Sequence, residues 1–135
     1  MTVPDPILTN VLVAAQAAAD KLADGIVAFD VSEQLSITDV FMIASADNER
    51  HVGAVVDGVE EALLKLKLKP TRREGDRENR WVLLDYLDFI VHVQHTEERT
   101  LYNLERLWKD CPQLELAIDL PPADDEAEGR AEGDE

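Results

Sequence analysis

The sequence predicts an α/β or α+β fold in which a mixed sheet of about five strands is flanked by helices. Segments with helical spacing of apolar residues alternate with short runs of branched apolar residues, which is typical of layered folds. The last two runs are joined by a tight turn and must pair antiparallel, so the sheet is expected to be mixed. Of the 135 residues, 45% are hydrophobic, which is enough for a sizeable core.

The first half is predicted to hold a helix followed by two strands. Asp5-Pro6 starts the helix, because Asp is a good cap and Pro fits the first turn, and Asp24-Gly25 ends it. Residues 26–31 and 40–44 are expected to be strands. The second of them is apolar on both faces, which predicts a central position in the sheet.

A second helix is expected from an Asp47 or Asn48 cap to about Leu66. Its buried stripe consists of branched apolar residues at helical spacing: Val52, Val55, Val56, Val59, Leu63 and Leu66.

Three strands and a last helix are predicted in the second half. Residues 71–74 form a short edge strand, and residues 81–85 and 89–95 are strands around a turn at 86–88. Thr96 is expected to cap a helix over residues 97–109. The predicted inner face of that helix carries Leu101, Leu104, Leu107 and Trp108.

Charge divides the chain near residue 118. Residues 1–118 are expected to fold as one domain, whereas residues 119–135 hold eight acidic residues, one arginine and almost no apolar side chain, which is typical of disorder. The net charge of −16 argues against general nucleic-acid binding and favours a basic protein as partner.

Neither secretion nor membrane insertion is expected. No apolar run approaches the ~20 residues that span a bilayer. The N-terminus has no basic segment before an apolar one. A single cysteine, Cys111, excludes an internal disulfide. These features predict a cytoplasmic protein.

The residues that could carry catalysis have unsuitable spacing. Mixed-sheet folds include nucleotidyltransferases, which hold two metal ions between carboxylates at alternate positions of one strand. Here Asp85 and Asp88 are separated by a turn. His92 and His95 point to opposite faces of one strand, so they cannot share a metal. We expect no catalytic centre, metal or cofactor, a hydrogen-bonded structural His92 and an exposed His95.

A protein-contact surface is predicted on the strand over residues 81–85. Trp81, Leu83 and Asp85 share one face, while Val82 and Leu84 share the other face, which suits the core. An aromatic residue surrounded by polar groups is typical of a binding hot spot, and Tyr86 is expected at the end of this row. The sequence leaves two alternatives for Trp81, the core and an interface between two protomers.

A basic cluster lies between Lys65 and Arg80 and holds seven of the twelve basic residues outside the tail. Acidic residues interleave with its arginines. The segment is either a solvated helix end with its loop or a local contact with phosphates in an assembly.

Several segments, taken together and in order, resemble the ribosomal silencing factor family, also called Iojap-like. They are D-V-S-E-Q-L-S-I-T-D-V-F-M-I-A-S at 30–45, E-G at 74–75, W-V-L-L-D-Y at 81–86, V-H-V at 91–93 and E-R-T-L-Y-N-L-E-R-L-W at 98–108. The resemblance covers about residues 8–109. The chain departs from the family pattern at residues 21–25 and 45–48, and at Leu87, where the family often has glycine.

The resemblance implies a nucleotidyltransferase-like fold without that activity. It implies binding to the large ribosomal subunit through ribosomal protein L fourteen, a block to joining of the small subunit, repression of translation when nutrients are scarce, and a homodimer. The alternatives are a residual nucleotidyltransferase-like enzyme and a dimeric scaffold. The contact residues that the resemblance implies are Trp81, Leu83, Asp85 and Tyr86, with Asp39, His92, Arg99 and Tyr102 as further members.

Overall fold

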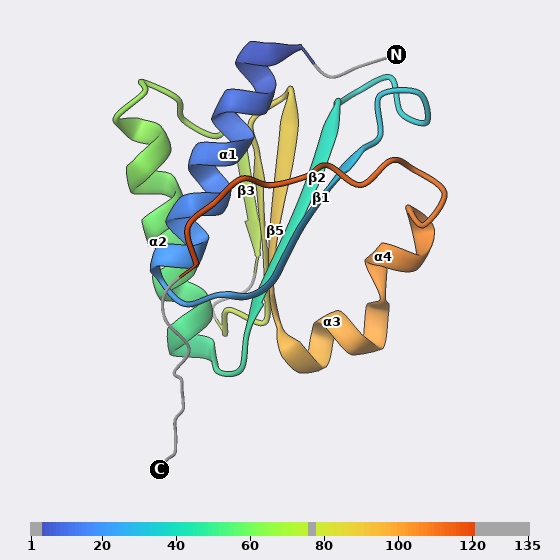
Figure 1. Ribbon diagram of the computed structural model, residues 1–135. Helices are drawn as coiled ribbons and strands as arrows, with labels where there is room; N and C mark the ends of the chain where they lie inside the picture. Colours follow the sequence, from blue (N-terminus) through green and yellow to red (C-terminus); the bar gives the residue numbers. More distant parts are fainter. Residues whose placement is uncertain (1–3, 76–77, 121–135) are drawn as a thin grey trace.

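Five strands form one sheet, and helices lie on both of its faces (Figure 1). The computed structural model describes residues 4–75 and 78–120. The sheet has the order β1-β2-β5-β4-β3; β2 and β5 are parallel and the other neighbours are antiparallel. The predicted mixed sheet of five strands flanked by helices is therefore confirmed. The elements in order are α1 (Asp5–Asp20), β1 (Asp24–Asp30), β2 (Val40–Ala46), α2 (Glu49–Leu64), β3 (Arg72–Gly75), β4 (Trp81–Asp85), β5 (Phe89–His95), α3 (Thr96–Tyr102) and α4 (Leu104–Leu107).

The main core lies between the sheet and the helices α1 and α2, which pack side by side on one face (Figure 1). Alternate strand residues point into this layer, among them Val40, Met42, Val82, Leu84, Val91 and Val93. The predicted stripe of α2 is buried from Val52 to Leu63, whereas Leu66 lies beyond the helix end and is 46% exposed. The prediction that Val82 and Leu84 form the core face of β4 is confirmed.

The opposite face of the sheet is covered over only part of its width. A second, smaller core consists of Phe29, Val31, Ile43 and Cys111, and Leu104 and Trp108 pack against it. These two residues come from α4 and its end, so the helices cover β1 and β2 on this side (Figure 1). The residues of β4 that point to this face are only half-buried. The uncovered part of the sheet is therefore the β4 side.

The helix boundaries differ from the sequence-based expectations at α1. This helix ends at Asp20, and Asp24-Gly25 already belongs to β1, so the predicted helix end was wrong. The reversal occurs at Leu22, which takes a left-handed φ of 65° and ends the helix without glycine. At α2 the prediction of an Asn48 cap is confirmed, because its side chain accepts a hydrogen bond of 2.8 Å from the backbone N–H of His51.

The last helix was predicted as one element and is two. Asn103 takes a left-handed conformation, φ 48° and ψ 57°, between α3 and α4. This break leaves Leu101 and Leu107 exposed, so the predicted inner face is correct only for Leu104 and Trp108. The cap is His95, whose Nδ1 accepts from the backbone N–H of Glu97, and not Thr96. The prediction that His95 is exposed was wrong, because this capping position buries it.

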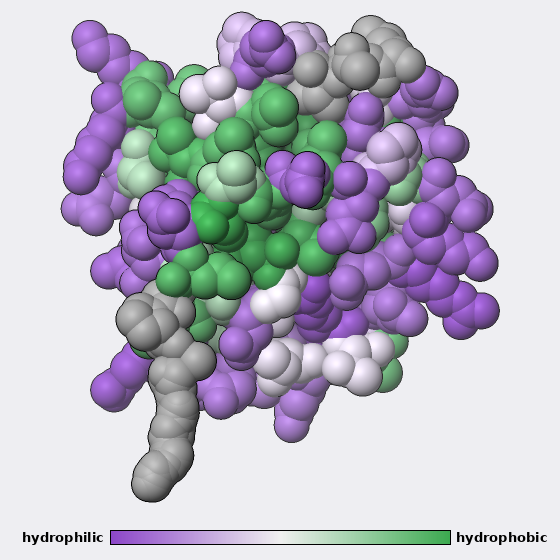
Figure 2. Space-filling view, viewed as in Figure 1, coloured by the Kyte–Doolittle hydropathy of each residue, from purple (hydrophilic) through white to green (hydrophobic). Residues whose placement is uncertain are grey.

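After α4 the chain runs back across β1 and α1. The backbone N–H of Leu114 donates to the carbonyl of Ala28, and the side chain of Gln16 exchanges two hydrogen bonds, of 2.7 and 2.9 Å, with the backbone of Asp119. Figure 2 shows apolar side chains gathered on this side of the molecule. Residues 121–135, most of the predicted acidic tail, lie outside the described residues.

Tyr86 lies in the main core, and its predicted place on the exposed row was wrong. It has the same strand parity as Val82 and Leu84, so its side chain points to the α1–α2 layer. Its ring stacks on Phe89 with ring centroids 5.0 Å apart. Within the described residues its buried hydroxyl has no hydrogen-bond partner, and burial raises the pKa of Tyr86 to about 12.

The Tyr86→Phe variant is expected to be as stable as the wild type or more stable by up to ~1 kcal/mol, because it removes an unpaired buried hydroxyl. Tyr86→Ala should lower the free energy of unfolding by ~3–5 kcal/mol, since it leaves a cavity beside Phe89. Urea denaturation of both variants measures the difference. Equal destabilisation by Phe and Ala would show that the hydroxyl, not the ring, holds this position.

Candidate partner-binding site

The half-covered face of the sheet presents a row of three residues on β4: Trp81, Leu83 and Asp85, called the contact row below. All three are half-buried, whereas the residues between them are buried. β3 pairs beside them, with Glu74 opposite Leu83. A shallow depression of about 300 Å³ is lined by Glu74, Gly75, Trp81 and Leu83. The row therefore combines an indole, an aliphatic side chain and carboxylates at the surface.

Trp81 is held on two sides by other side chains. Its indole Nε1–H donates a hydrogen bond of 3.1 Å to Nδ1 of His92 on β5. Its ring also contacts Tyr102 of α3, with ring centroids 4.9 Å apart at an angle of 45°. Because two elements fix the indole, its orientation is set before any partner arrives, which lowers the entropy cost of binding.

His92 supports this arrangement from beneath. It is 4% exposed, and the ring of Phe41 lies 5.0 Å from its own. Burial lowers the pKa of His92 to about 4, so the imidazole is neutral at neutral pH. Since Nδ1 accepts from the indole, the proton of the neutral ring is assigned to Nε2. The predicted hydrogen-bonded structural role of His92 is confirmed.

Asp85 and Asp39 lie at one end of the contact row. The Asp85 carboxylate accepts a hydrogen bond of 2.8 Å from the backbone N–H of Leu87, which braces the turn between β4 and β5. The backbone N–H of Asp39 donates to the carbonyl of Asp88 in the same turn, at 3.0 Å. Both residues therefore adjoin the β4–β5 turn, Asp85 through its carboxylate and Asp39 through its backbone.

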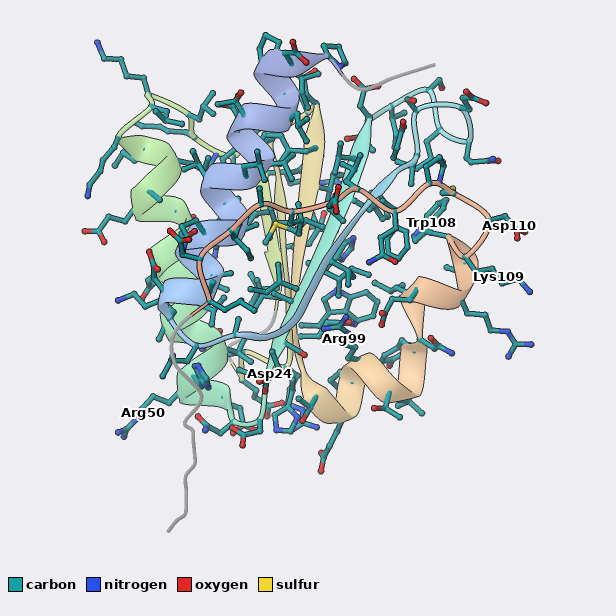
Figure 3. The ribbon with its side chains drawn as sticks, in the orientation of Figure 1. Asp24, Arg50, Arg99, Trp108, Lys109 and Asp110 are labelled. Atoms are coloured by element: carbon teal, nitrogen blue, oxygen red, sulfur yellow. The ribbon has the colours of Figure 1, made fainter. Side chains whose placement is uncertain are left out.

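Arg99 is tied into the fold. Its guanidinium donates to the Glu105 carboxylate at 3.0 Å, to the Ser45 hydroxyl at 3.0 Å and to the carbonyl of Asp24 at 3.3 Å. Figure 3 shows the side chain directed from α3 toward Asp24 and the sheet. With only 14% of the side chain exposed, Arg99 joins α3 to the edge of the sheet.

Of the eight residues named from the sequence, the structure brings five together: the contact row, the exposed Tyr102 beside Trp81, and the buried His92 beneath it. Asp39 lies at the end of this group, and Arg99 and Tyr86 do not share its surface. Leu87 is 59% exposed on the turn after Asp85, next to this group. Alternation along β4 contained a signal for the error at Tyr86, because residues 81, 83 and 85 share one parity and Tyr86 has the other.

Arg80 joins three elements next to the site. It forms ion pairs with Glu49 of α2 at 3.0 Å and with Glu97 and Glu98 of α3 at 2.8 Å each. A backbone hydrogen bond and Arg80 lower the pKa of Glu49, and Arg80 lowers that of Glu97. The mutual hydrogen bonds raise the pKa of the Arg80 guanidinium. Arg80 is therefore a structural residue at the start of β4.

The other described arginines of the Lys65–Arg80 segment also form ion pairs. Arg73 contacts Glu60 at 2.6 Å, and Arg72 contacts Glu74 at 3.0 Å. Arg77 lies outside the described residues. The exposed basic groups that remain are three lysines after α2: Lys65, Lys67 and Lys69.

The described part of the chain has neither a cluster of metal-ligating side chains nor a membrane-spanning helix. Among residues 4–75 and 78–120, no three His, Cys, Asp or Glu side chains are placed to hold a metal ion. None of the helices described here is long and apolar enough to cross a bilayer.

The fold and the contact row define a small α+β protein that presents one half of a sheet face with a fixed aromatic residue. The chain belongs to the ribosomal silencing factor family: the family model described as "Ribosomal silencing factor during starvation" matches residues 4–135. The family that the sequence segments resembled is thereby confirmed.

Known proteins agree with this assignment over most of the chain. A protein of Halalkalibacterium halodurans named "Ribosomal silencing factor RsfS" is 38% identical over 103 residues, 76% of this chain and 88% of that protein. A crystal structure of a protein from Bacillus halodurans has a TM-score of 0.71 and 34% identity, covering 81% of this chain and 99% of that one. A more distant mouse relative, named "Mitochondrial assembly of ribosomal large subunit protein 1", is 29% identical over 109 residues, 76% of this chain and 48% of its own.

Acid should destabilise the protein in part through His92. Its pKa falls from 6.5 in the unfolded chain to about 4 in the fold, so the stability from its neutral form is complete above pH 6.5 and is lost as the pH falls toward 4. Relative to a non-titrating His92→Gln variant, the wild type should lose on the order of 3 kcal/mol more across that window.

Urea denaturation at pH 8, 6, 5 and 4 measures this difference, and the ring signals of His92 in NMR give its pKa directly. A ring titration with a midpoint near 6.5 would contradict the buried, neutral imidazole.

Proposed function

We propose that this protein binds the large ribosomal subunit through ribosomal protein L fourteen, and that Trp81, Leu83, Asp85 and Tyr102 form the contact. The observation that carries the proposal is the Trp81 indole, half-exposed and fixed by His92 and Tyr102. Fixed aromatic residues at the centre of a polar rim are the usual anchors of protein interfaces. Membership of the silencing factor family and the name of the mouse relative support a ribosomal partner.

The proposed mechanism is occlusion without catalysis. A factor seated on the large subunit where the small subunit joins would block joining and repress translation under nutrient limitation. An interface of ~800 Å² per partner is the usual size for a specific complex, and a few good anchors make it tight. The net charge of −16 favours a basic protein surface over bare RNA. The protein is proposed to act in the cytoplasm as a homodimer.

A local contact with ribosomal RNA is a further part of the proposal. Lys65, Lys67 and Lys69 are exposed on the segment after α2, whereas Arg72, Arg73 and Arg80 are engaged with carboxylates of the same chain. Lysines that neutralise phosphates release counterions and make binding depend on salt. The lysines, rather than the arginines, are therefore the proposed RNA contact.

Trp81→Ala should weaken binding to isolated large subunits by ~2 kcal/mol or more, about 30-fold, while the fold survives, because the indole belongs to the surface row. Co-sedimentation with purified large subunits measures the affinity, and circular dichroism checks the fold. Leu64→Ala is the matched control, since Leu64 is 51% exposed on α2, over the opposite sheet face.

Unchanged co-sedimentation of Trp81→Ala would remove the contact row from the interface. If Trp81 instead lies between two protomers, the variant should halve the molecular mass in light scattering and leave large-subunit affinity unchanged or higher. This outcome would favour the dimeric scaffold.

Occlusion has a separate test. Adding the wild-type protein to large subunits before small subunits should reduce the joined-ribosome peak in a sucrose gradient, and Trp81→Ala should reduce it far less at equal concentration. Binding to large subunits with an undiminished joined peak would contradict the occlusion mechanism.

A further inference from the structure

The turn between β4 and β5 holds a leucine in a backbone conformation that leucine rarely adopts. Leu87 has φ 73°. The backbone N–H of Asp88 donates to the carbonyl of Tyr86 at 2.9 Å, so Leu87 is the central residue of a γ-turn with positive φ, the rarer and strained form. The N–H of Tyr86 donates to the carbonyl of Phe89 at 3.0 Å and closes the hairpin around it.

This conformation is unfavourable for leucine, and the side chain is too exposed for packing to offset its cost. A positive φ is unfavourable for a residue with a Cβ atom, whereas glycine adopts it freely. The Leu87 side chain is 59% exposed and belongs to neither core cluster, so packing returns little of that cost. Strained backbone conformations that the surrounding structure holds in place are typical of functional positions.

The turn is joined to the contact row. The carboxylate of Asp85, the last member of the row, accepts the backbone N–H of Leu87 at 2.8 Å. On the other side, the loop before β2 is bonded to the turn through the N–H of Asp39 and the carbonyl of Asp88, at 3.0 Å. Leu87 is thus an exposed apolar side chain on a turn that three aspartates adjoin: Asp88 follows it, Asp85 accepts its N–H, and Asp39 is bonded to the turn through its backbone. The Asp85 carboxylate also lies 3.9 Å from Arg72.

We propose that Leu87 is a further partner-contacting residue, and that the binding face extends from the contact row over the β4–β5 turn. The occupant is a basic protein surface of the large subunit with an apolar recess for the leucine; the three aspartates would face its cations. This inference rests on the proposed function and extends its surface by one anchor.

The chain offers a closely matched control in Leu22. This leucine also has a left-handed φ, 65°, and is also 59% exposed, but it follows α1, away from β4. Replacement by glycine relieves a positive φ at both positions. Only at position 87 does it remove the proposed contact.

The experiment compares Leu87→Gly, Leu87→Ala and Leu22→Gly with the wild type in two assays: urea denaturation and co-sedimentation with large subunits. Both glycine variants should have an unfolding midpoint at least as high as the wild type. Leu87→Gly and Leu87→Ala should each bind about tenfold more weakly, whereas Leu22→Gly should bind as the wild type does. A variant that is no less stable yet binds less well is the signature of a contact residue.

Three outcomes would overturn the inference. If both Leu87 variants bind as the wild type while Trp81→Ala loses binding, the turn is outside the interface and the proposed function stands. If Leu22→Gly weakens binding equally, added chain flexibility accounts for the loss. If the wild type itself does not sediment with large subunits, the proposed function and this inference both fail.

Discussion

The parallel pairing of β2 with β5 is the interaction on which the rest of this fold depends. It runs over the whole of both strands, from Val40 opposite Phe89 to Ala46 opposite His95. It joins the first half of the chain to the hairpin of the second half and puts β5 in the middle of the sheet. Every residue of β5 is consequently buried, including His92 and Gln94. This strand carries three polar residues, His92, Gln94 and His95, and it lies in the centre of the sheet because β2 and β4 pair with it on both sides.

Unequal coverage of the two sheet faces then determines which part of the sheet is open to solvent. The helices α1 and α2 have 16 residues each, whereas α3 and α4 have seven and four, so the second layer reaches across only part of its face. Arg80 holds the start of β4 against the first turns of α2 and α3 through three carboxylates. The outer face of β4 after Arg80 remains open. Trp81 lies at the covered end of this face, and the β4–β5 turn lies at its other end.

The open face is rigid rather than adaptable. Trp81 is oriented by the His92 imidazole, which burial keeps neutral, and by the ring of Tyr102. The turn after Asp85 is held by four hydrogen bonds. A surface whose side chains are already held in place loses little conformational entropy when it binds a partner.

Local patterns in the sequence determined much of this protein: the strands 81–85 and 89–95, the Asn48 cap, the buried stripe of α2, and the division of β4 into a Val82–Leu84 core face and a Trp81–Leu83–Asp85 outer face. These depend on side-chain period and capping within a few residues. Tertiary structure alone decided the Trp81–His92 hydrogen bond, the burial of His95, the tie of Arg99 to Ser45 and the exposure of Leu101 and Leu107. The exposure of Leu101 and Leu107 follows from the left-handed Asn103 that breaks the last helix. The tie of Arg99 to Ser45 joins residues 54 positions apart, and local periodicity carries no information about such neighbours. The hairpin of β4 and β5 was predicted, but the hydrogen bond between Trp81 and His92 within it depends on the rotamers that packing selects.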